Sequence, residues 1–170
     1  METADGEAHG RHVPGEEEKL IPIDLDDSIR SRILPVRLVI FDMDGVLTDG
    51  RIIYHDDGSE IKAFDVQDGH GIKLLQRAGL EVAFITGRFC RAVDHRARGL
   101  GVTRVYQGIK VKMEAYEKIR RETGLEDEQI CFMGDDLIDI PVMRRVGFAV
   151  AVPNAVVHVL PYAHYVTRAP

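Results

Sequence analysis

The chain has 170 residues, of which 45% are hydrophobic, and a formal net charge of −6 at pH 7. This length suits a single domain, because one hydrophobic core commonly takes about 100–150 residues. No apolar stretch approaches the roughly 20 residues that a membrane-spanning helix needs, and the amino terminus shows no apolar segment typical of a signal peptide. Composition therefore predicts a cytoplasmic protein without a membrane partner.

The negative charge lies at the beginning of the chain. Residues 1–30 contain nine Asp or Glu and three Lys or Arg, so they hold the whole surplus and the remaining 140 residues are neutral. A neutral folded part offers no positive surface that would attract nucleic acid. Residues 1–20 also hold almost no large apolar side chains. We therefore expect an acidic, largely disordered leader over 1–34 and a single folded domain over 35–170.

Strand and helix patterns alternate along the rest of the chain. In chain order, we expect a helix at 24–33, strands at 37–41, 51–55 and 60–64, a helix at 70–78, a strand at 81–85, a helix at 89–98, a strand at 104–107, a helix at 110–123, a strand at 129–133, a helix at 137–146, and strands at 148–152 and 164–167. The turn sequence at 56–59 joins the second and third strands into a β-hairpin. Such alternation indicates an α/β fold with a doubly wound parallel sheet.

Polar groups gather where predicted strands end. Asp42 and Asp44 close the first apolar strand, and Gly45 lets the backbone turn sharply there. Further candidates follow later strands or begin the next helix: Thr86, Lys112, Asp135, Asp136 and Asp139. Each alone has an ordinary structural explanation, such as a helix N-cap, a turn residue or a solvated surface charge. Together and in this order they favour one pocket, because ligands of doubly wound sheets bind outside the carboxyl ends of strands.

These residue types suit phosphoryl transfer. Mg²⁺ prefers oxygen ligands and commonly takes one or two carboxylates, which Asp42 and Asp135 would supply. Asp42 would attack phosphorus to form an aspartyl-phosphate, while Asp44 would protonate the leaving alkoxide and later activate water. Lys112 and Thr86 would hold the phosphoryl oxygens. The two other carboxylates would orient metal-bound water and the lysine: Asp136 and Asp139.

The run Asp42-Met-Asp-Gly-Val-Leu-Thr-Asp49 resembles the D-x-D-G-[VT]-[LI] signature of the haloacid dehalogenase (HAD) superfamily, whose members work through an aspartyl-phosphate and magnesium. From about Leu38 to Arg168, the chain also resembles the 3-deoxy-D-manno-octulosonate 8-phosphate (KDO 8-phosphate) phosphatases. The stretches that carry this second resemblance are Asp42–Gly50, Lys62–Ile72, Ile85–Arg88, Tyr106–Gly108, Gly134–Met143 and Tyr165–Arg168.

This resemblance implies a HAD-like domain without a cap, in which the hairpin at 51–64 replaces a lid and assembles the chains into a homotetramer. It implies Mg²⁺ bound by Asp42, Asp135 and the main-chain oxygen of Asp44. It also implies a sugar-acid phosphate as substrate, in the synthesis of lipopolysaccharide precursors. The substrate contacts that carry over are Asp44, Asp65, Val66, Gln67, Asp68, Gly69, Lys73, Arg88, Arg96 and Lys112. An arginine can bind a phosphate or a carboxylate bidentately, which suits such a substrate.

Other functions remain open at this point. A phosphatase of a related nonulosonate 9-phosphate, or a free-standing relative of the phosphatase-like domain attached to some sialate cytidylyltransferases, would bind a similarly anionic sugar acid. A catalytically silent HAD-like domain could serve assembly alone. A receiver domain is less consistent with Asp44, because it needs no acid or base two residues after its phosphorylated aspartate. A phosphomutase needs a cap that shields its intermediate from water, and this sequence has no room for one.

Overall fold

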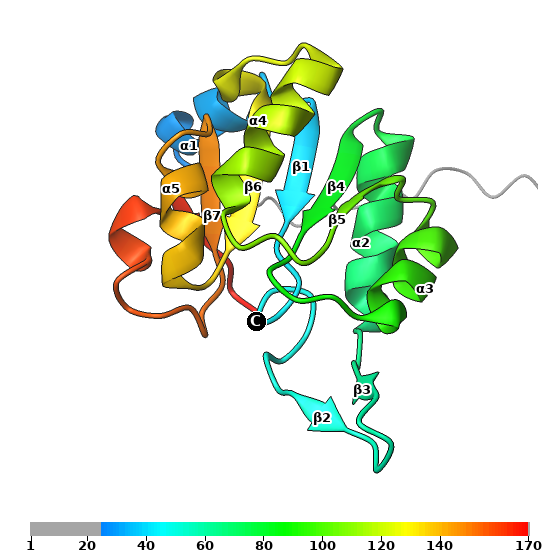
Figure 1. The fold of residues 1–170 in the computed structure, drawn as a ribbon. Coiled ribbons are helices and arrows are strands. Elements are labelled where there is room, and N and C mark those ends of the chain that lie inside the picture. Colours follow the sequence, from blue (N-terminus) through cyan, green and yellow to red (C-terminus); the bar gives the residue numbers. More distant parts are fainter. Residues whose placement is uncertain (1–24, 170) are drawn as a thin grey trace, which may run out of the picture.

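Strand β1 (Leu38–Phe41) consists of four buried apolar residues and lies inside a six-stranded sheet. A strand that is covered on both faces needs apolar side chains on both, which this run provides. The computed structural model describes residues 25–169 (Figure 1). All strand pairs of the large sheet are parallel, in the order β5-β4-β1-β6-β7-β8. The other strands are β4 (Glu81–Ile85), β5 (Arg104–Tyr106), β6 (Ile130–Gly134), β7 (Phe148–Ala151) and β8 (Tyr165–Val166).

Helices cover both faces of this sheet, so the predicted doubly wound α/β fold is confirmed (Figure 1). Successive side chains of a strand point to opposite faces. Accordingly, Val39 and Phe41 belong to one core cluster, whereas Leu38 and Ile40 belong to the other. The first cluster includes side chains of α1 (Asp27–Ile33), α2 (Val66–Arg77) and α3 (Arg91–Leu100), and the second includes side chains of α4 (Lys112–Thr123) and α5 (Ile140–Met143). Short 3-10 turns lie at Asp127–Gln129, Leu137–Asp139 and Leu160–Tyr162.

The sheet order determines where the site lies. β1 pairs with β4 on one side and with β6 on the other, and Phe41 is in register with both Phe84 and Met133. The residues that follow these three strands therefore meet at one edge of the sheet. Asp42, Thr86 and Asp135 are among them.

Several helix boundaries differ from the sequence predictions by one to four residues, and two of these differences have a clear local cause. The helix that we predicted over 70–78 begins at Val66, because the side chain of Asp65 accepts a hydrogen bond from the N–H of Gln67 and caps the helix. The helix that we predicted to stop at Gly99 continues to Leu100. It ends at Gly101, whose φ of 69° is the left-handed conformation common after a helix.

The helix predicted over 137–146 is interrupted. A 3-10 turn at Leu137–Asp139 is followed by the short helix α5. Pro141 has no N–H to donate to the carbonyl of Leu137, so a continuous α-helix loses a hydrogen bond there. The carboxylate of Asp139 instead accepts the N–H groups of Asp135 and Asp136, which stabilises the turn.

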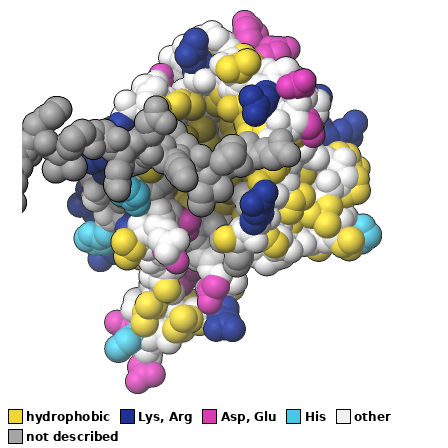
Figure 2. Space-filling model, turned by 180° about the vertical axis from the view of Figure 1, so that it is seen from behind, with side chains coloured by type: hydrophobic (Ala, Val, Ile, Leu, Met, Phe, Trp, Pro, Cys, Tyr) yellow, Lys and Arg dark blue, Asp and Glu magenta, His cyan; other side chains and the backbone are white. Residues whose placement is uncertain are grey.

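The predicted hairpin is present, with shorter strands than expected. β2 (Ile53–Tyr54) and β3 (Glu60–Ile61) pair antiparallel and project from the domain (Figure 1). Hydrophobic side chains gather on this projection, as Figure 2 shows from behind, and the exposed ones are Ile52, Ile53, Tyr54 and Ile61. Within residues 25–169 no cap domain covers the sheet edge, and no helix there is long and apolar enough to cross a bilayer. Of the leader predicted to be largely disordered over 1–34, residues 1–24 lie outside the described residues, and the described part holds helix α1.

Candidate active site

Lys112 links two of the predicted carboxylates. Asp42 directly follows β1, Asp139 ends the 3-10 turn after β6, and Lys112 is the first residue of α4. The Lys112 Nζ lies 2.8 Å from an oxygen of Asp42 and 2.5 Å from Oδ1 of Asp139. All three side chains are almost fully buried. The lysine that the sequence placed at a helix start is therefore a buried ion-pair partner rather than a solvated surface charge.

Burial and charge perturb these groups. Burial raises the pKa of Asp42 to about 8, against the opposing effect of the Lys112 charge. For Lys112, burial acts to lower the pKa, but the charges of Asp42 and Asp139 outweigh it and the pKa is raised. A cation placed beside Asp42 would favour its ionised form.

Asp135 approaches the backbone of Gly45 closely. Gly45 has a φ of 96°, and a Cβ added there would lie 2.1 Å from Oδ2 of Asp135. Oδ1 of Asp135 is buried and has no hydrogen-bond partner within residues 25–169. Burial, reinforced by the charge of Asp139, raises the pKa of Asp135 to about 6. Asp135 thus presents an unpaired carboxylate oxygen, which is the group that a metal ion binds.

The donor set fits a hard divalent cation. One oxygen from each of Asp42, Asp135 and Asp139 lies within 4.8 Å of the others. One ammonium, that of Lys112, faces these three carboxylates, so the pocket carries surplus negative charge that a cation would neutralise. Both oxygens of Asp139 already accept hydrogen bonds, one from Lys112 and the other from two backbone N–H groups. Asp42 and Asp135 are therefore the carboxylates with free coordination capacity, as the sequence predicted for Mg²⁺.

Thr86 is buried directly after β4, with an exposed fraction of 1%. Its N–H donates to the carbonyl of Tyr106, and its hydroxyl accepts a long hydrogen bond of 3.4 Å from the N–H of Arg88. Asp136, by contrast, is exposed, and its carboxylate caps the 3-10 turn at Leu137. Asp136 and Asp139 were both predicted to orient metal-bound water and Lys112. Asp139 makes the contact with the lysine.

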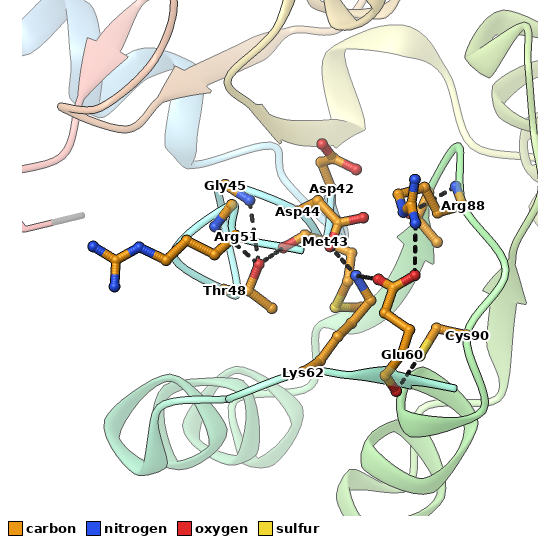
Figure 3. Close-up of polar contacts among 12 residues, drawn as sticks. Asp42, Met43, Asp44, Gly45, Thr48, Arg51, Glu60, Lys62, Arg88 and Cys90 are labelled. Carbon is orange, nitrogen blue, oxygen red and sulfur yellow. Dashed lines mark hydrogen bonds and ion pairs between the residues drawn. The ribbon is translucent and has the colours of Figure 1, made fainter. Parts of the chain in front are cut away.

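Asp44 contacts a residue that the sequence analysis did not single out. Its carboxylate forms an ion pair with Lys62, whose Nζ also lies 2.7 Å from Glu60. The other oxygen of Glu60 lies 2.7 Å from the guanidinium of Arg88 (Figure 3). This guanidinium also donates to the hydroxyl of Tyr54. Glu60 and Lys62 are two positions apart in the strand predicted at 60–64. This spacing predicts that their side chains lie on the same face, and it was the signal that could have identified Lys62.

The predicted substrate residues lie at the start of α2. Asp65 caps this helix, Gly69 is buried in it, and the exposed residues Val66 and Gln67 form its first turn. A cavity of about 330 Å³ adjoins them and is lined by Val46, Leu47, Thr48, Asp49, Ala63, Phe64, Asp65 and Asp68. Burial raises the pKa of Asp68. This cavity therefore lies between the loop after β1 and the helix predicted to contact substrate.

Lys73 and Arg96 have other contacts in this structure. The ammonium of Lys73 donates to the carbonyl of Leu100 at the end of α3. The guanidinium of Arg96 donates to the carbonyl of Asp65 and lies over the ring of Phe64. Both side chains bridge elements within the described chain and make no ion pair with the carboxylates described above.

Asn154 is a further residue that sequence reasoning missed. Its side-chain amide donates to the carbonyl of Gly45 over 2.8 Å, and the neighbouring Val156 donates its N–H to the carbonyl of Asp135. The loop after β7 therefore holds both partners of the Gly45–Asp135 contact. No local pattern marks this asparagine, because its role depends on a contact 109 positions away.

The fold and the site define a haloacid dehalogenase-like hydrolase. A family model of that description matches residues 105–170. The 3-deoxy-D-manno-octulosonate 8-phosphate phosphatase KdsC of Yersinia pestis is 46% identical over 142 residues, which cover 84% of this chain and 76% of that protein. On this similarity, the chain belongs to the family of KDO 8-phosphate phosphatases.

Solved structures agree with this assignment. A crystal structure of the phosphatase from Yersinia pestis superposes with a TM-score of 0.82 at 45% identity and covers 84% of this chain and 77% of that one. The phosphatase from Moraxella catarrhalis, solved with a magnesium ion, a phosphate ion and a KDO molecule, superposes with a TM-score of 0.79 at 37% identity and covers 83% and 80%.

Proposed function

We propose that this chain is a Mg²⁺-dependent phosphatase that hydrolyses KDO 8-phosphate to KDO and phosphate. Family membership supports the substrate class, and the structure of the Moraxella catarrhalis relative supports the metal. The observation that carries the proposal is the buried cluster in which Lys112 bridges Asp42 and Asp139 beside the unpaired carboxylate of Asp135. Such a cluster unites a nucleophile, a fixed positive charge and a cation site at one sheet edge.

Asp42 is the nucleophile in this proposal. One of its carboxylate oxygens attacks phosphorus, and the bond between phosphorus and the ester oxygen breaks. Asp44 donates its proton to that oxygen, so KDO leaves as a neutral alcohol rather than as an alkoxide. The products of this half-reaction are free KDO, an aspartyl-phosphate on Asp42 and an ionised Asp44.

The second half-reaction restores the enzyme. Ionised Asp44 accepts a proton from water as the water oxygen attacks phosphorus. The bond between phosphorus and the Asp42 oxygen breaks, which frees phosphate and returns both carboxyl groups to their initial states. Lys112, already fixed by Asp139, and the hydroxyl of Thr86 stabilise the charge that develops on the phosphoryl oxygens.

Asp42, Asp135 and the main-chain oxygen of Asp44 would hold Mg²⁺. When bound, the ion neutralises phosphoryl charge and so permits an anionic nucleophile to approach an anionic substrate. Asp139 fixes Lys112, and Asp136 stabilises the turn that carries both Asp135 and Asp139.

We propose that the sugar acid contacts residues at the mouth of the site. The substrate stretch Asp65–Gly69 lines one side beside the 330 Å³ cavity, and Arg88 projects from the other, with its side chain 40% exposed. Arg88 can grip the carboxylate or the phosphate bidentately. Lys73 and Arg96 can contact the substrate only after they break their hydrogen bonds to the carbonyl oxygens of Leu100 and Asp65.

Parallel phosphate-release assays test the assignment. KDO 8-phosphate and a nonulosonate 9-phosphate are compared at equal concentration with Mg²⁺, beside a chelator control. We expect the eight-carbon substrate to have the higher kcat/KM and the chelator to abolish turnover. A preference for the nine-carbon acid overturns the substrate, and the absence of any Mg²⁺-dependent release favours a silent assembly domain.

A homotetramer formed through the hairpins is a further part of the proposal. Ile52, Ile53, Tyr54 and Ile61 expose apolar surface on the projection, and such surface marks interaction sites. Light scattering should give about four times the 19.0 kDa mass of the chain. Ile53→Glu should reduce this mass, and a wild-type monomer contradicts the assembly. A cytoplasmic location and a role in lipopolysaccharide precursor synthesis stay predictions from the sequence.

A further inference from the structure

The hairpin reaches into the site through a buried lysine. The side chain of Lys62 is 1% exposed, although this residue directly follows β3 of a projecting, largely exposed hairpin. Its ammonium lies between the carboxylates of Asp44 and Glu60, and Glu60 also binds the guanidinium of Arg88 (Figure 3). Two acids and two bases thus alternate along one chain of contacts: Asp44, Lys62, Glu60 and Arg88.

Such a burial needs a reason. A lysine loses its hydration when it is buried, and it remains charged there only when carboxylates compensate for the loss. The carboxylates of Asp44 and Glu60 both contact the Lys62 ammonium and supply this compensation. Lys62 is therefore held as an ammonium at a defined place, which a solvated surface lysine is not.

Strand geometry explains why this lysine points inward. Glu60 lies in β3 and Lys62 directly follows it, and their side chains contact each other, so both lie on one side of the extended chain and Ile61 takes the other. Ile61 is 46% exposed, consistent with this alternation. A hairpin with two-residue strands thereby places both charges of its inner face toward the end of β1.

The carboxylates of the site are anchored differently. Asp42 and Asp139 share Lys112, which belongs to α4. Asp44 lies in the loop after β1, and within residues 25–169 the side-chain partner of its carboxylate is Lys62. Its orientation consequently depends on the hairpin rather than on the sheet.

We propose that Lys62 is a positioning residue that holds the Asp44 carboxyl group in the orientation from which it protonates the leaving oxygen. This inference rests on the proposed phosphatase function and adds a residue to it. Glu60 is the second positioning residue, because it fixes Lys62 and Arg88 relative to each other. The hairpin then connects Asp44, which acts on the leaving oxygen, to Arg88, which binds the substrate.

A comparison of two phosphate esters distinguishes a loss of Asp44 positioning from a general loss of active-site structure. The leaving oxygen of KDO 8-phosphate departs from an alcohol and needs a proton, whereas p-nitrophenolate is a stable anion that departs without one. The ratio kcat/KM covers only the steps up to departure of the leaving group, so it isolates this proton transfer from the later hydrolysis.

The variants are Lys62→Met, which removes the charge at similar length, and Lys62→Arg, which keeps it. We expect Lys62→Met to lower kcat/KM for KDO 8-phosphate by about 10²-fold and that for p-nitrophenyl phosphate by less than about 3-fold. Lys62→Arg should recover part of the loss. Lys118→Met is the matched control, because Lys118 is 55% exposed on α4, and it should leave both substrates unchanged.

An equal loss on both substrates, or no loss on KDO 8-phosphate, overturns the proposal. Melting temperatures of all variants are compared, and if Lys62→Met fails to fold, Glu60→Gln replaces it. Glu60→Gln should show a smaller loss with the same bias toward the sugar phosphate, and a loss without bias counts against the proposal. If the wild type prefers another sugar-acid phosphate, the proposed substrate fails while the same comparison on the preferred ester still tests Lys62.

Discussion

The strand-end cluster and the hairpin hold their charges in different ways. The cluster of Asp42, Asp135, Asp139 and Lys112 has three carboxylates and one ammonium, on or beside buried strands. The hairpin chain of Asp44, Lys62, Glu60 and Arg88 has two carboxylates and two bases, and thus balances itself. Because only the first has surplus negative charge, its carboxylates are the ones that suit a divalent cation.

The two regions also differ in rigidity. β1, β4 and β6 pair over their whole length and carry the proposed nucleophile and the proposed metal ligand Asp135 at their ends. The hairpin has two paired residues in each strand and exposes most of its surface. The proposed nucleophile therefore lies on the sheet, while the proposed acid and base Asp44 and the proposed substrate contact Arg88 depend on contacts with the hairpin.

The largest expected effect lies in the cluster. Asp42→Asn removes the nucleophile, so turnover of KDO 8-phosphate should fall on the order of 10⁴-fold or more while the protein stays folded. Phosphate release and melting temperature check this. Asp27→Asn, the same chemical change on an exposed residue of α1, should keep activity. Near-wild-type turnover by Asp42→Asn would remove the basis of the mechanism.

Metal binding should depend on the cluster and not on its exposed neighbour. Mg²⁺ at 100 times its Kd should stabilise the wild type by about 2.7 kcal/mol over a chelator-treated sample. Asp135→Asn should lose most of this shift, because it removes a carboxylate with a free oxygen. Asp136→Asn should retain it, since Asp136 caps a turn. Thermal melts with and without Mg²⁺ measure both, and equal shifts in the two variants contradict the assignment.

Two glycines with positive φ sharpen the contrast between the regions. Gly45→Ala places a Cβ 2.1 Å from the Asp135 carboxylate, whereas Gly58→Ala in the hairpin turn meets nothing within 4 Å. Gly58→Ala should cost only the conformational strain, about 1–2 kcal/mol, and keep activity. Gly45→Ala should destabilise more and also lose the Mg²⁺ shift. Urea unfolding and phosphate release compare them, and equal effects would mean that the close approach is unimportant.

The smallest expected effect concerns the hairpin at acid pH. The hydrogen bond from Arg88, aided by Lys62, lowers the pKa of Glu60 below its ordinary value of 4.5. Its stabilising contribution is therefore complete above about pH 4.5 and is lost as the pH falls through the lowered pKa. The difference in melting temperature between the wild type and Glu60→Gln should be constant near neutrality and shrink below pH 4.5. A difference that persists at pH 3 argues against this ion pair.

Much of the site could be predicted because its signals are local. An apolar run that ends in Asp42-Met-Asp-Gly45 specifies a buried strand, its end and the turn after it within eight residues. The same holds for Thr86 after β4 and for Asp135 after β6. In a parallel sheet such ends share one edge, so these residues meet whatever the loops do.

Other features required the folded chain. The local sequence does not identify Lys62 as the partner of Asp44, because this contact exists only when the hairpin folds back over 18 positions. The helix α2 begins four residues earlier than expected, although two glycines near its start disfavour a helix, because the Asp65 cap and packing outweigh propensity. In both cases a non-local contact decides between conformations that local sequence leaves close in free energy.

The amino-acid sequence alone thus determined the order of strands and helices, the catalytic motif and the family, since periodicity and motif spacing are properties of short segments. Tertiary structure alone decided which two carboxylates contact Lys112, which lysine contacts Asp44, and which carbonyl groups Lys73 and Arg96 bind. These outcomes depend on the distances between segments far apart in the chain, and burial of charge makes only a few pairings tolerable.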